Sequence, residues 1–418
     1  MSKKSQVPPA PGGTRGHPPD PAGLPPSQPV RPPAEVDVSP RASALISLAE
    51  HAAGRLSYAV RAVPDQEALV YSLLLRDVLS SARLSGHTVS PIETWKAALI
   101  AHHPRGAGGR ARADVDAATG DDPLSRFVRA ARLLADEIAE GEPADAALLG
   151  RVSAVLTGHE PGSTGDGLRR TESVLTAGPD GPPYARATPP DQLPSALAAW
   201  DEWLAGPFEG PRLARIAVGH AVLELNQPYP VANGHVTRLF TTAELVRRGL
   251  VDVPVLSLSP WLDDHGEEYH RRLLRVAEHG EWSAWVEFFA RGVQEQALAT
   301  IELIHAQAEL REELARSVSG PPSLRKVLDA LPTAPVTSIQ ALVDLHGLYE
   351  RTAAQITRDL ERQGTLRALV ERPFRIFVCD RAMDVLSLQR AAVTEHVRDA
   401  FRPPADPPST APPEETTP

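Results

Sequence analysis

Apolar residues recur at intervals of three and four along most of this chain, which is the spacing of helices with one buried face. Leu69, Leu73 and Leu74 show it on a single helical face. Ser90-Pro91-Ile92-Glu93 has the form of a capping box with proline at the first helical position. Helices are expected over residues 41–55, 65–79, 90–100, 123–139, 143–156, 193–204 and 286–318, and on both sides of a loop within 227–238.

Two stretches have the pattern of short β-strands instead. Residues 171–175 and 184–188 flank the turn-forming Gly178-Pro179-Asp180-Gly181, which predicts a β-hairpin. Near the C-terminus, helices are expected over 323–331, 337–345 and 350–363, followed by strands at 366–370 and 374–379. This order is the outline of a winged helix-turn-helix. The predicted fold class is mainly α, a helical bundle with a small β-hairpin and a C-terminal winged helix.

The remaining segments lack apolar periodicity. Residues 1–38 are rich in proline, glycine and serine, and residues 402–418 are rich in proline, so both are expected to be disordered tails. Residues 103–122 are rich in glycine and arginine and are expected to form a loop. Between the tails we expect an N-terminal helical region at 39–122, a core at 123–319 and the winged helix at 320–390.

The composition of the 418 residues narrows the functional classes. A net charge of −10 argues against indiscriminate nucleic-acid binding. The single cysteine, Cys379, excludes an internal disulfide and a cysteine-based zinc site, and the 14 histidines form no metal-binding pattern, so no metal site is expected. No apolar run approaches the length of a membrane span, and the N-terminus has no apolar segment of the signal-peptide type. A soluble, cytoplasmic protein without a membrane partner is expected.

One stretch carries the candidate chemistry, namely Gln227-Pro228-Tyr229-Pro230-Val231-Ala232-Asn233-Gly234-His235-Val236-Thr237-Arg238. It lies between two helical runs, and its prolines and Asn-Gly pair predict a short, sharp loop. Such a loop directs backbone N–H groups and the N-terminus of the next helix towards one point. That arrangement is suited to binding phosphate.

The stretch resembles the signature of the Fic (Fido) family of AMP-transferring proteins, His-Pro-Phe-x-Asp/Glu-Gly-Asn-Gly-Arg-x-x-Arg. Pro228, Asn233, Gly234 and Arg238 are kept. The preceding His220-Ala221-Val222-Leu223-Glu224 matches the family's His-Ala-x-Phe-Glu, a register that makes its histidine a structural residue. The resemblance extends from about residue 41 to about residue 390. It implies a Fic-type helical bundle in which Asn233, Gly234 and Arg238 bind phosphate or nucleotide.

Positions that carry chemistry in the family are changed. Gln227 stands at the histidine that removes the proton from the target hydroxyl, and an amide has no titratable site for that task. Val231 stands at the acid that holds Mg²⁺ on the phosphates, and it offers no oxygen ligand. His235 stands at an arginine that neutralises phosphate charge, which histidine does only weakly near pH 7. The resemblance implies ATP with Mg²⁺ as the ligand, but the metal-ligand position is lost at Val231.

Two further family elements match outside the signature. Residues 79–86 resemble a helix end whose glutamate blocks the nucleotide-binding arginine in the resting enzyme, and Ser85 stands at that glutamate. Its loss fits the loss of the arginine at His235. Gly167-Leu168-Arg169-Arg170-Thr171 resembles the Gly-x-x-Arg-Thr stretch that leads into the family's β-hairpin flap.

In the family the flap pairs with the segment that is modified. The expected docking strand is therefore Thr171, Glu172, Ser173, Val174 and Leu175. The alternative is that the flap is only an inherited piece of the fold, and the two readings are evenly balanced.

The second helix of the winged helix-turn-helix carries residue types that suit DNA contacts, namely Arg351, Thr352, Gln355, Arg358 and Arg362. Asp359, Glu361 and Glu371 lower the positive charge around them. Such modules also serve protein contacts, so DNA and protein are both kept as candidate partners. A homodimer formed through the bundle also stays open.

The first functional hypothesis is a Fic-fold protein that is impaired in AMP transfer. It would bind a nucleotide or another anionic ligand and a peptide, with the winged helix as its output. The alternative is an enzyme of the same fold with altered chemistry, in which Gln227 orients a substrate and His235 or another residue supplies acid or base. Residual AMP transfer to a Ser, Thr or Tyr hydroxyl ranks third.

Overall fold

The structure is a computed structural model that describes residues 28–87, 89–101, 123–162, 167–176, 183–318, 320–369 and 375–387. Over these ranges the chain is mainly helical with two small antiparallel sheets, which confirms the predicted fold class at that level. The expected loop at 103–122, the turn at 178–181 and the tail at 402–418 lie outside the described residues. Among the helices of the described ranges, none combines the length and the apolar character that a membrane span needs.

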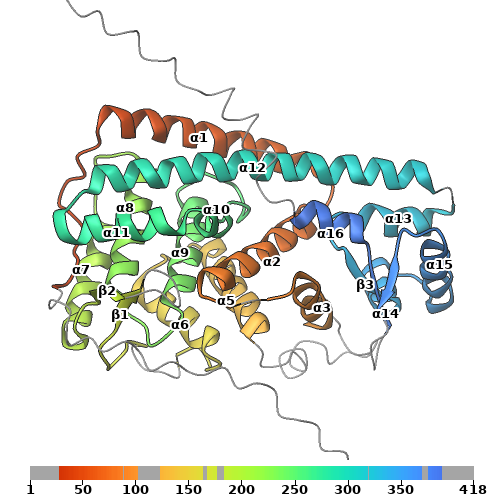
Figure 1. Cartoon of the computed structure of the whole chain (residues 1–418), viewed down its shortest axis with the longest axis horizontal. Coiled ribbons are helices and arrows are strands. Elements are labelled where there is room, and N and C mark those ends of the chain that lie inside the picture. Colours follow the sequence, from red (N-terminus) through yellow and green to blue (C-terminus); the bar gives the residue numbers. More distant parts are fainter. Residues whose placement is uncertain are drawn as a thin grey trace, which may run out of the picture.

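Two long helices pack side by side along the molecule (Figure 1). They are α1 (Pro40–Arg61) and α12 (Trp282–Ser317), and each is longer than the apolar spacing predicts. Ser39 caps α1, since its Oγ accepts a hydrogen bond from the Ala42 N–H (3.0 Å) and donates one to Glu287 Oε1 of α12 (2.8 Å). The buried face of α1 is rich in alanine, and small side chains allow two helices to approach closely.

The segment before α1 corrects one expectation. The Val30 N–H donates to Asn226 Oδ1 (3.1 Å), and Asn226 Nδ2 donates to the Val30 carbonyl (2.9 Å). Val36 and Val38 pack against the main hydrophobic core. The prediction that all of residues 1–38 form a disordered tail is therefore wrong for residues 28–38.

A helix–loop–helix of α8 (Arg212–Asn226) and α9 (Asn233–Arg247) lies at the centre of the core and carries the candidate motif. α8 is buried on nearly all sides, which is typical of a central helix. The elements around it are α2 (Gln66–Leu84), α3 (Pro91–Ala101), α5 (Pro123–Ala139), α6 (Ala146–Leu156), the 3₁₀-helix η2 (Pro190–Gln192), α7 (Leu193–Ala205), α10 (Ser259–Asp264) and α11 (Gly266–His279).

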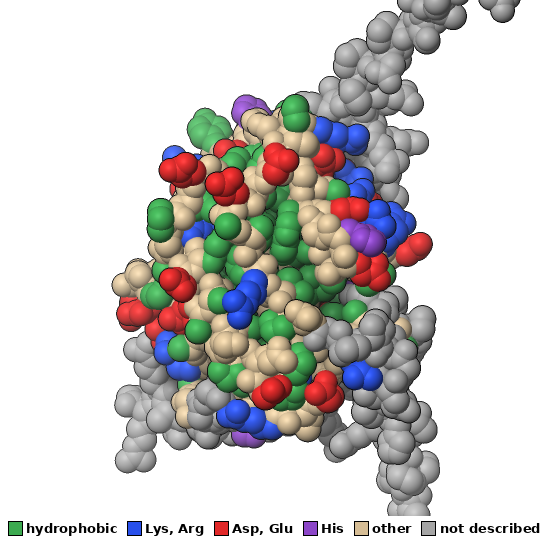
Figure 2. Space-filling model, turned by 90° about the vertical axis from the view of Figure 1, so that its left-hand side faces the viewer, with side chains coloured by type: hydrophobic (Ala, Val, Ile, Leu, Met, Phe, Trp, Pro, Cys, Tyr) green, Lys and Arg blue, Asp and Glu red, His purple; other side chains and the backbone are tan. Residues whose placement is uncertain are grey.

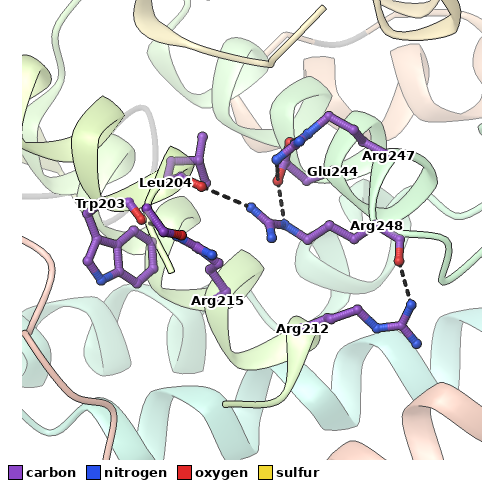
Figure 3. A network of polar contacts seen from close by, with 8 residues as sticks. Trp203, Leu204, Arg212, Arg215, Glu244, Arg247 and Arg248 are labelled. Carbon is purple, nitrogen blue, oxygen red and sulfur yellow. Dashed lines mark hydrogen bonds and ion pairs between the residues drawn. The ribbon is translucent and has the colours of Figure 1, made fainter. Parts of the chain in front are cut away.

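Charged groups anchor the C-terminal end of α9 to α7 and α8 (Figure 3). Glu244 is fully buried and accepts hydrogen bonds from Arg247 (3.0 Å) and Arg248 (2.6 Å). Arg248 also donates to the Leu204 carbonyl at the end of α7 (3.4 Å), and Arg212 of α8 donates to the Arg248 carbonyl (2.6 Å). Two guanidinium groups offset the desolvation of the buried carboxylate. The cluster thus fixes the end of α9 that lies away from the motif.

His220 is a structural residue, as its register predicts. Its ring is fully buried, with Nδ1 bonded to Thr241 Oγ1 (2.8 Å) and Nε2 bonded to the Tyr269 hydroxyl (2.9 Å). The Trp285 ring packs beside it with a centroid separation of 5.7 Å. Burial lowers the pKa of His220 to about 3, so the imidazole is neutral at physiological pH.

The predicted flap is an antiparallel hairpin of β1 (Val174–Thr176) and β2 (Pro183–Arg186). Residues 171–173 precede the first strand, so the strand begins later than expected. Leu175 is buried in the main core, whereas Thr171 and Glu172 are exposed. Figure 2, a view from the flap end of the molecule, shows hydrophobic side chains interspersed with acidic and basic ones and no single charged field.

A C-terminal module follows α12. Most of its elements occur where the sequence predicts them, but the strand at 336–338 and the helix at 380–387 were not expected. The elements are α13 (Pro322–Ala330), β3 (Val336–Ser338), α14 (Ile339–His346), α15 (Glu350–Arg362), β4 (Arg367–Leu369), β5 (Ile376–Val378) and α16 (Asp380–Ser387). The three strands form an antiparallel sheet in the order β3-β5-β4. The prediction of helix from residue 337 is wrong at its start, because Thr337 pairs with Phe377 and Ser338 is the N-cap of α14. Leu310 and Leu314 of α12 complete the hydrophobic core of the module.

Candidate functional site

The candidate site is the loop between α8 and α9, which Asn233 holds in shape. Its Oδ1 accepts a hydrogen bond from the Tyr229 N–H (2.7 Å), and its Nδ2 donates to the Tyr229 carbonyl (2.7 Å). Tyr229 is buried, and its hydroxyl donates to the Ala146 carbonyl at the start of α6 (3.3 Å). The side chain of Asn233 therefore binds the loop itself, and it contributes to a ligand site by positioning the backbone.

Two residues of the loop have left-handed backbone. Gln227 has φ of 47° and Ala232 has φ of 61°, and they are the two non-glycine residues with positive φ in the part of the chain that the structure describes. Left-handed backbone costs a residue with a Cβ about 1 kcal/mol or more, which explains why a glycine stands at the Ala232 position in the family signature. Strained backbone of this kind is held in place by the surrounding structure and clusters at functional sites.

Arg169 is the main support of the loop. Its buried guanidinium donates to four backbone carbonyls, those of Gln227 (2.7 Å), Thr171 (2.7 Å), Asn226 (3.2 Å) and Thr188. These carbonyls belong to the end of α8 and to both sides of the flap. Helix ends have carbonyls without partners inside the helix, and here one side chain satisfies them. Arg169 thus joins the motif to the flap.

Asn226 extends this support to the N-terminal segment. Its Oδ1 accepts hydrogen bonds from the Val30 N–H (3.1 Å) and from the Thr188 hydroxyl next to the flap. Three segments distant in sequence therefore meet directly before Gln227.

Gln227 is turned back onto its own helix. Its Nε2 donates to the Glu224 carbonyl (2.8 Å) and lies 3.3 Å from Glu224 Oε1. Burial raises the pKa of the Glu224 carboxyl, although the Arg238 charge opposes this. In the described part of the chain, Glu224 Oε2 is buried without a hydrogen-bond partner. Gln227, which the resemblance aligns with the family's base, thus contacts a buried carboxyl through its amide.

His235 belongs to a directed network with Ser81, Ser85 and Arg238. Ser81 Oγ accepts hydrogen bonds from Arg238 Nε (3.0 Å) and Nη2 (2.8 Å), so its single proton points to His235 Nδ1 (2.6 Å). The other ring nitrogen, Nε2, then carries the proton and donates to Ser85 Oγ (3.2 Å). The Ser85 hydroxyl in turn donates to the Ser81 carbonyl (3.1 Å). The network is satisfied only with a neutral imidazole.

Burial, together with the neighbouring Arg238 and His87, lowers the pKa of His235 to about 3. A second proton on the ring would point at Ser81 Oγ, which already accepts from Arg238. The Phe127 ring covers the imidazole edge to face at 5.3 Å. His235, which the resemblance aligns with the family's phosphate-binding arginine, is therefore a neutral, enclosed ring, and the helix end that carries Ser85 lies on top of it.

This network predicts a pH effect on stability. The folded-state pKa of His235 is lowered below its ordinary value of about 6.5, so its contribution is complete above that value and is lost as the pH falls towards 3. Between pH 7 and pH 5, the wild type is expected to lose roughly 2 kcal/mol more unfolding free energy than His235→Asn. Denaturant unfolding at the two pH values measures the difference. His220 titrates in both proteins and cancels, and equal losses would contradict the neutral network.

Arg238 and Gly234 form the part of the loop that suits an anion. A Cβ added at Gly234 would lie 2.8 Å from Arg238 Nη1, so the guanidinium lies directly over the first turn of α9. Ser81 holds the opposite edge of the guanidinium. Within the residues that the structure describes, Nη1 makes no hydrogen bond. A positive charge and the N-terminus of a 15-residue helix are thus adjacent.

The residues present do not fit a magnesium ion at the family's metal position. Val231 is 55% exposed, and its hydrocarbon side chain supplies no oxygen. Over the described ranges, no group of three or more His, Cys, Asp or Glu side chains is placed to hold a metal ion.

The DNA-contact candidates on α15 are largely paired with one another and with Asp359. Gln355 donates to Asp359 Oδ1 (2.9 Å), Arg358 donates to Gln355 Oε1 (2.9 Å), and Arg362 donates to Asp359. Arg351 is exposed and Thr352 is partly buried on the first turn of α15. These exposed pairs are weak and could exchange for phosphate, so DNA binding stays a prediction.

Sequence reasoning missed Arg169, Asn226 and Ser81. Arg169 and Arg170 are adjacent arginines, and the matched Gly-x-x-Arg-Thr stretch places its arginine at Arg170, which is exposed. Ser81 lies in the matched helix end, but nothing in its sequence context marks it as the partner of both His235 and Arg238.

Comparison with known proteins bears on the fold. No family model matches the sequence. A crystal structure of a Fic family protein from Desulfovibrio desulfuricans G20 matches at a TM-score of 0.50 and 16% identity, over 84% of this chain and 98% of that chain. Fic-1 from C. elegans matches at 0.44 and 18% identity, over 64% and 74% of the two chains. A Fic domain-containing signaling protein from Bacteroides thetaiotaomicron matches at 0.44 and 12% identity, over 60% and 95%. The first of these matches supports the fold, because it reaches a TM-score of 0.50 over most of this chain.

Proposed function

We propose that this protein, which has the fold of the Fic family, binds a nucleotide or another anionic ligand at the start of α9 without transferring AMP. The observation that carries the proposal is that the loop keeps the residues that suit an anion and lacks those that catalysis would need. The anion-binding half is present, since Arg238 lies over Gly234 at the N-terminus of α9. The base and the metal ligand are absent, since the Gln227 amide bonds to Glu224 and Val231 offers no metal ligand.

Each missing group removes a separate part of AMP transfer. Without a base, the attacking hydroxyl keeps its proton, and general-base catalysis commonly contributes about 10²–10⁴-fold. Without an oxygen ligand at Val231, the charge on the phosphates is not offset by a metal. With His235 neutral beneath Ser85, the second phosphate contact is missing as well. The loss of all three supports a binding protein over a transferase.

The flap and the C-terminal module supply the other surfaces of this proposal. The flap is tied to the motif through Arg169, so a ligand at the loop and a peptide on the flap share one support. The C-terminal module shares α12 with the core and serves as the output, with DNA or a protein as its partner.

Binding of ATP to the full chain, with and without Mg²⁺, tests the proposal by titration calorimetry. We expect ATP to bind equally in both conditions and to be recovered unchanged. Arg238→Ala is expected to weaken binding about tenfold or more, because a charge-assisted contact to phosphate is worth about 1.5–3 kcal/mol. Arg271→Ala, an exposed arginine on α11, is the control and should bind as the wild type does. No binding by the wild type, or full binding by Arg238→Ala, contradicts the proposal.

One observation favours a second candidate, an enzyme with altered chemistry. The buried carboxyl of Glu224 contacts Gln227, and its Oε2 has no partner among the described residues. A carboxyl with a raised pKa is suited to acid–base work. Release of pyrophosphate from ATP that Glu224→Gln or His235→Ala abolishes would establish this candidate in place of the first.

A further inference from the structure

A cavity of about 690 Å³ lies where α2, α3, α5 and α9 face the C-terminal module. Figure 1 shows how these helices and the module are arranged. Its volume is within the range of small-molecule sites, which is about 300–1,000 Å³. Leu73 of α2, Trp95 of α3 and Leu239 of α9 line it from the core, and Val327 and Leu342 line it from the module. The wall is therefore mostly apolar and is built from both cores.

Gln296 gives the cavity wall a buried acceptor that makes no hydrogen bond among the described residues. Gln296 of α12 lies in its wall and is 3% exposed. The Thr300 hydroxyl donates to the Gln296 carbonyl (2.9 Å), so it must accept from the Gln296 amide N–H (3.3 Å). This fixes the orientation of the amide. Over the described ranges, no donor meets Gln296 Oε1. A buried acceptor left this way is destabilising by about 1–3 kcal/mol, which a donor on a ligand would offset.

The charges of the wall indicate which ligands fit. The acidic residues are Asp65, Glu67, Asp77 and Asp136, and the arginines are Arg76 and Arg132. Asp77 is buried and accepts a hydrogen bond from Ser257. Asp65, Glu67 and Asp136 are exposed, and burial raises the pKa of the Asp77 carboxyl, so these groups place little negative charge inside the cavity. Gln296 Oε1 is a buried acceptor. A phosphate or carboxylate would bring only acceptors to this acceptor and would lose its hydration against a mostly apolar wall.

We propose that this cavity binds a small, mostly apolar molecule that is neutral or cationic and donates an N–H or O–H hydrogen bond to Gln296 Oε1. The site is separate from the loop at α9 and selects against nucleotides. It also lies against α2 and α9, which contact each other at the motif. Leu73 and Asp77 line the cavity on α2, whereas Ser81 and Ser85 of the same helix contact His235. A ligand here would join the C-terminal module to the helix that covers the motif.

A matched pair of fluorescent probes tests the chemistry on the full chain. N-phenyl-1-naphthylamine is neutral and apolar and has one N–H donor. 1-Anilinonaphthalene-8-sulfonate has the same rings with an added anionic group. We expect the neutral probe to bind at least tenfold more tightly and to raise the melting temperature. Equal binding of the two probes would overturn the proposed ligand class.

Two variants test the place. Ala135→Trp fills the cavity from α5, and Ala334→Trp fills it from the C-terminal module. Both are expected to abolish binding of the neutral probe, while Ala139→Trp, exposed one turn further along α5, keeps it. Circular dichroism and thermal melting identify the variants that fold. Because the two substitutions enter from opposite walls, one folded variant is enough to test the site. Wild-type affinity in a folded blocked variant would overturn the site.

A third variant tests the hydrogen bond. 1-Phenoxynaphthalene replaces the N–H of the neutral probe with an ether oxygen. The wild type is expected to prefer the amine by about two- to tenfold, and Gln296→Leu is expected to remove this preference. A preference that survives in Gln296→Leu would show that Gln296 Oε1 does not receive the donor.

Discussion

Replacing Arg169 with alanine is expected to lower the free energy of unfolding by about 3–5 kcal/mol. The guanidinium is 2% exposed and donates to carbonyls of Gln227, Thr171, Asn226 and Thr188. Its removal leaves these carbonyls buried without donors and opens a hole between the motif and the flap. Denaturant unfolding at pH 7 measures the loss, and proteolysis at the flap is expected to accelerate with it.

The neighbouring arginine provides the control. Arg170 is exposed, so Arg170→Ala is expected to change the unfolding free energy by less than about 1 kcal/mol. Arg169→Lys keeps the charge but has no planar fork that can reach several carbonyls, and it is expected to recover only part of the loss. Similar losses for Arg169→Ala and Arg170→Ala would show that the buried contacts do not support the loop.

Local patterns predicted most of the helices of this chain. The helix at 123–139 was expected from apolar spacing alone, and α5 has the same bounds. The hairpin and most of the C-terminal elements were also expected from the sequence, but β3 and α16 were not. The predicted helix ends were less accurate where capping and tertiary contacts determine where a helix stops. One case is α1, which continues to Arg61. At the start of α14, pairing with β5 takes Thr337 into a strand that the sequence pattern does not show.

The candidate site could be located from the sequence, but its internal contacts could not. The motif marks the loop between α8 and α9, because prolines and an Asn-Gly pair are local signals. Whether Asn233 binds a ligand or Tyr229 depends on the loop conformation, and the structure shows the second. Similarly, the sequence indicates that Ser85 and His235 are changed together, but their hydrogen bond depends on how α2 packs on α9.

The triple variant Gln227→His, Val231→Asp, His235→Arg is expected to transfer AMP from ATP with Mg²⁺ to a hydroxyl acceptor. It supplies in one step the base, the metal ligand and the phosphate contact that the resemblance assigns to these positions. Arg238, Gly234 and the supported loop are already in place. Incubation with labelled ATP and cell extract, followed by mass spectrometry, measures the transfer. The rate is expected to exceed that of the matched double variant, which keeps Gln227, by about 10²-fold or more.

The double variant Val231→Asp, His235→Arg is expected to bind ATP with Mg²⁺ and to transfer little, which separates binding from proton removal. Adding Ser85→Glu to the triple variant should then reduce transfer, because residue 85 lies on residue 235 and a glutamate there would pair with the new arginine. The neutral Ser85–His235 contact of the natural chain would become a charged one. If the triple variant folds, binds ATP and still transfers nothing, the pocket beyond these three residues has diverged, and the second candidate function gains support over the first.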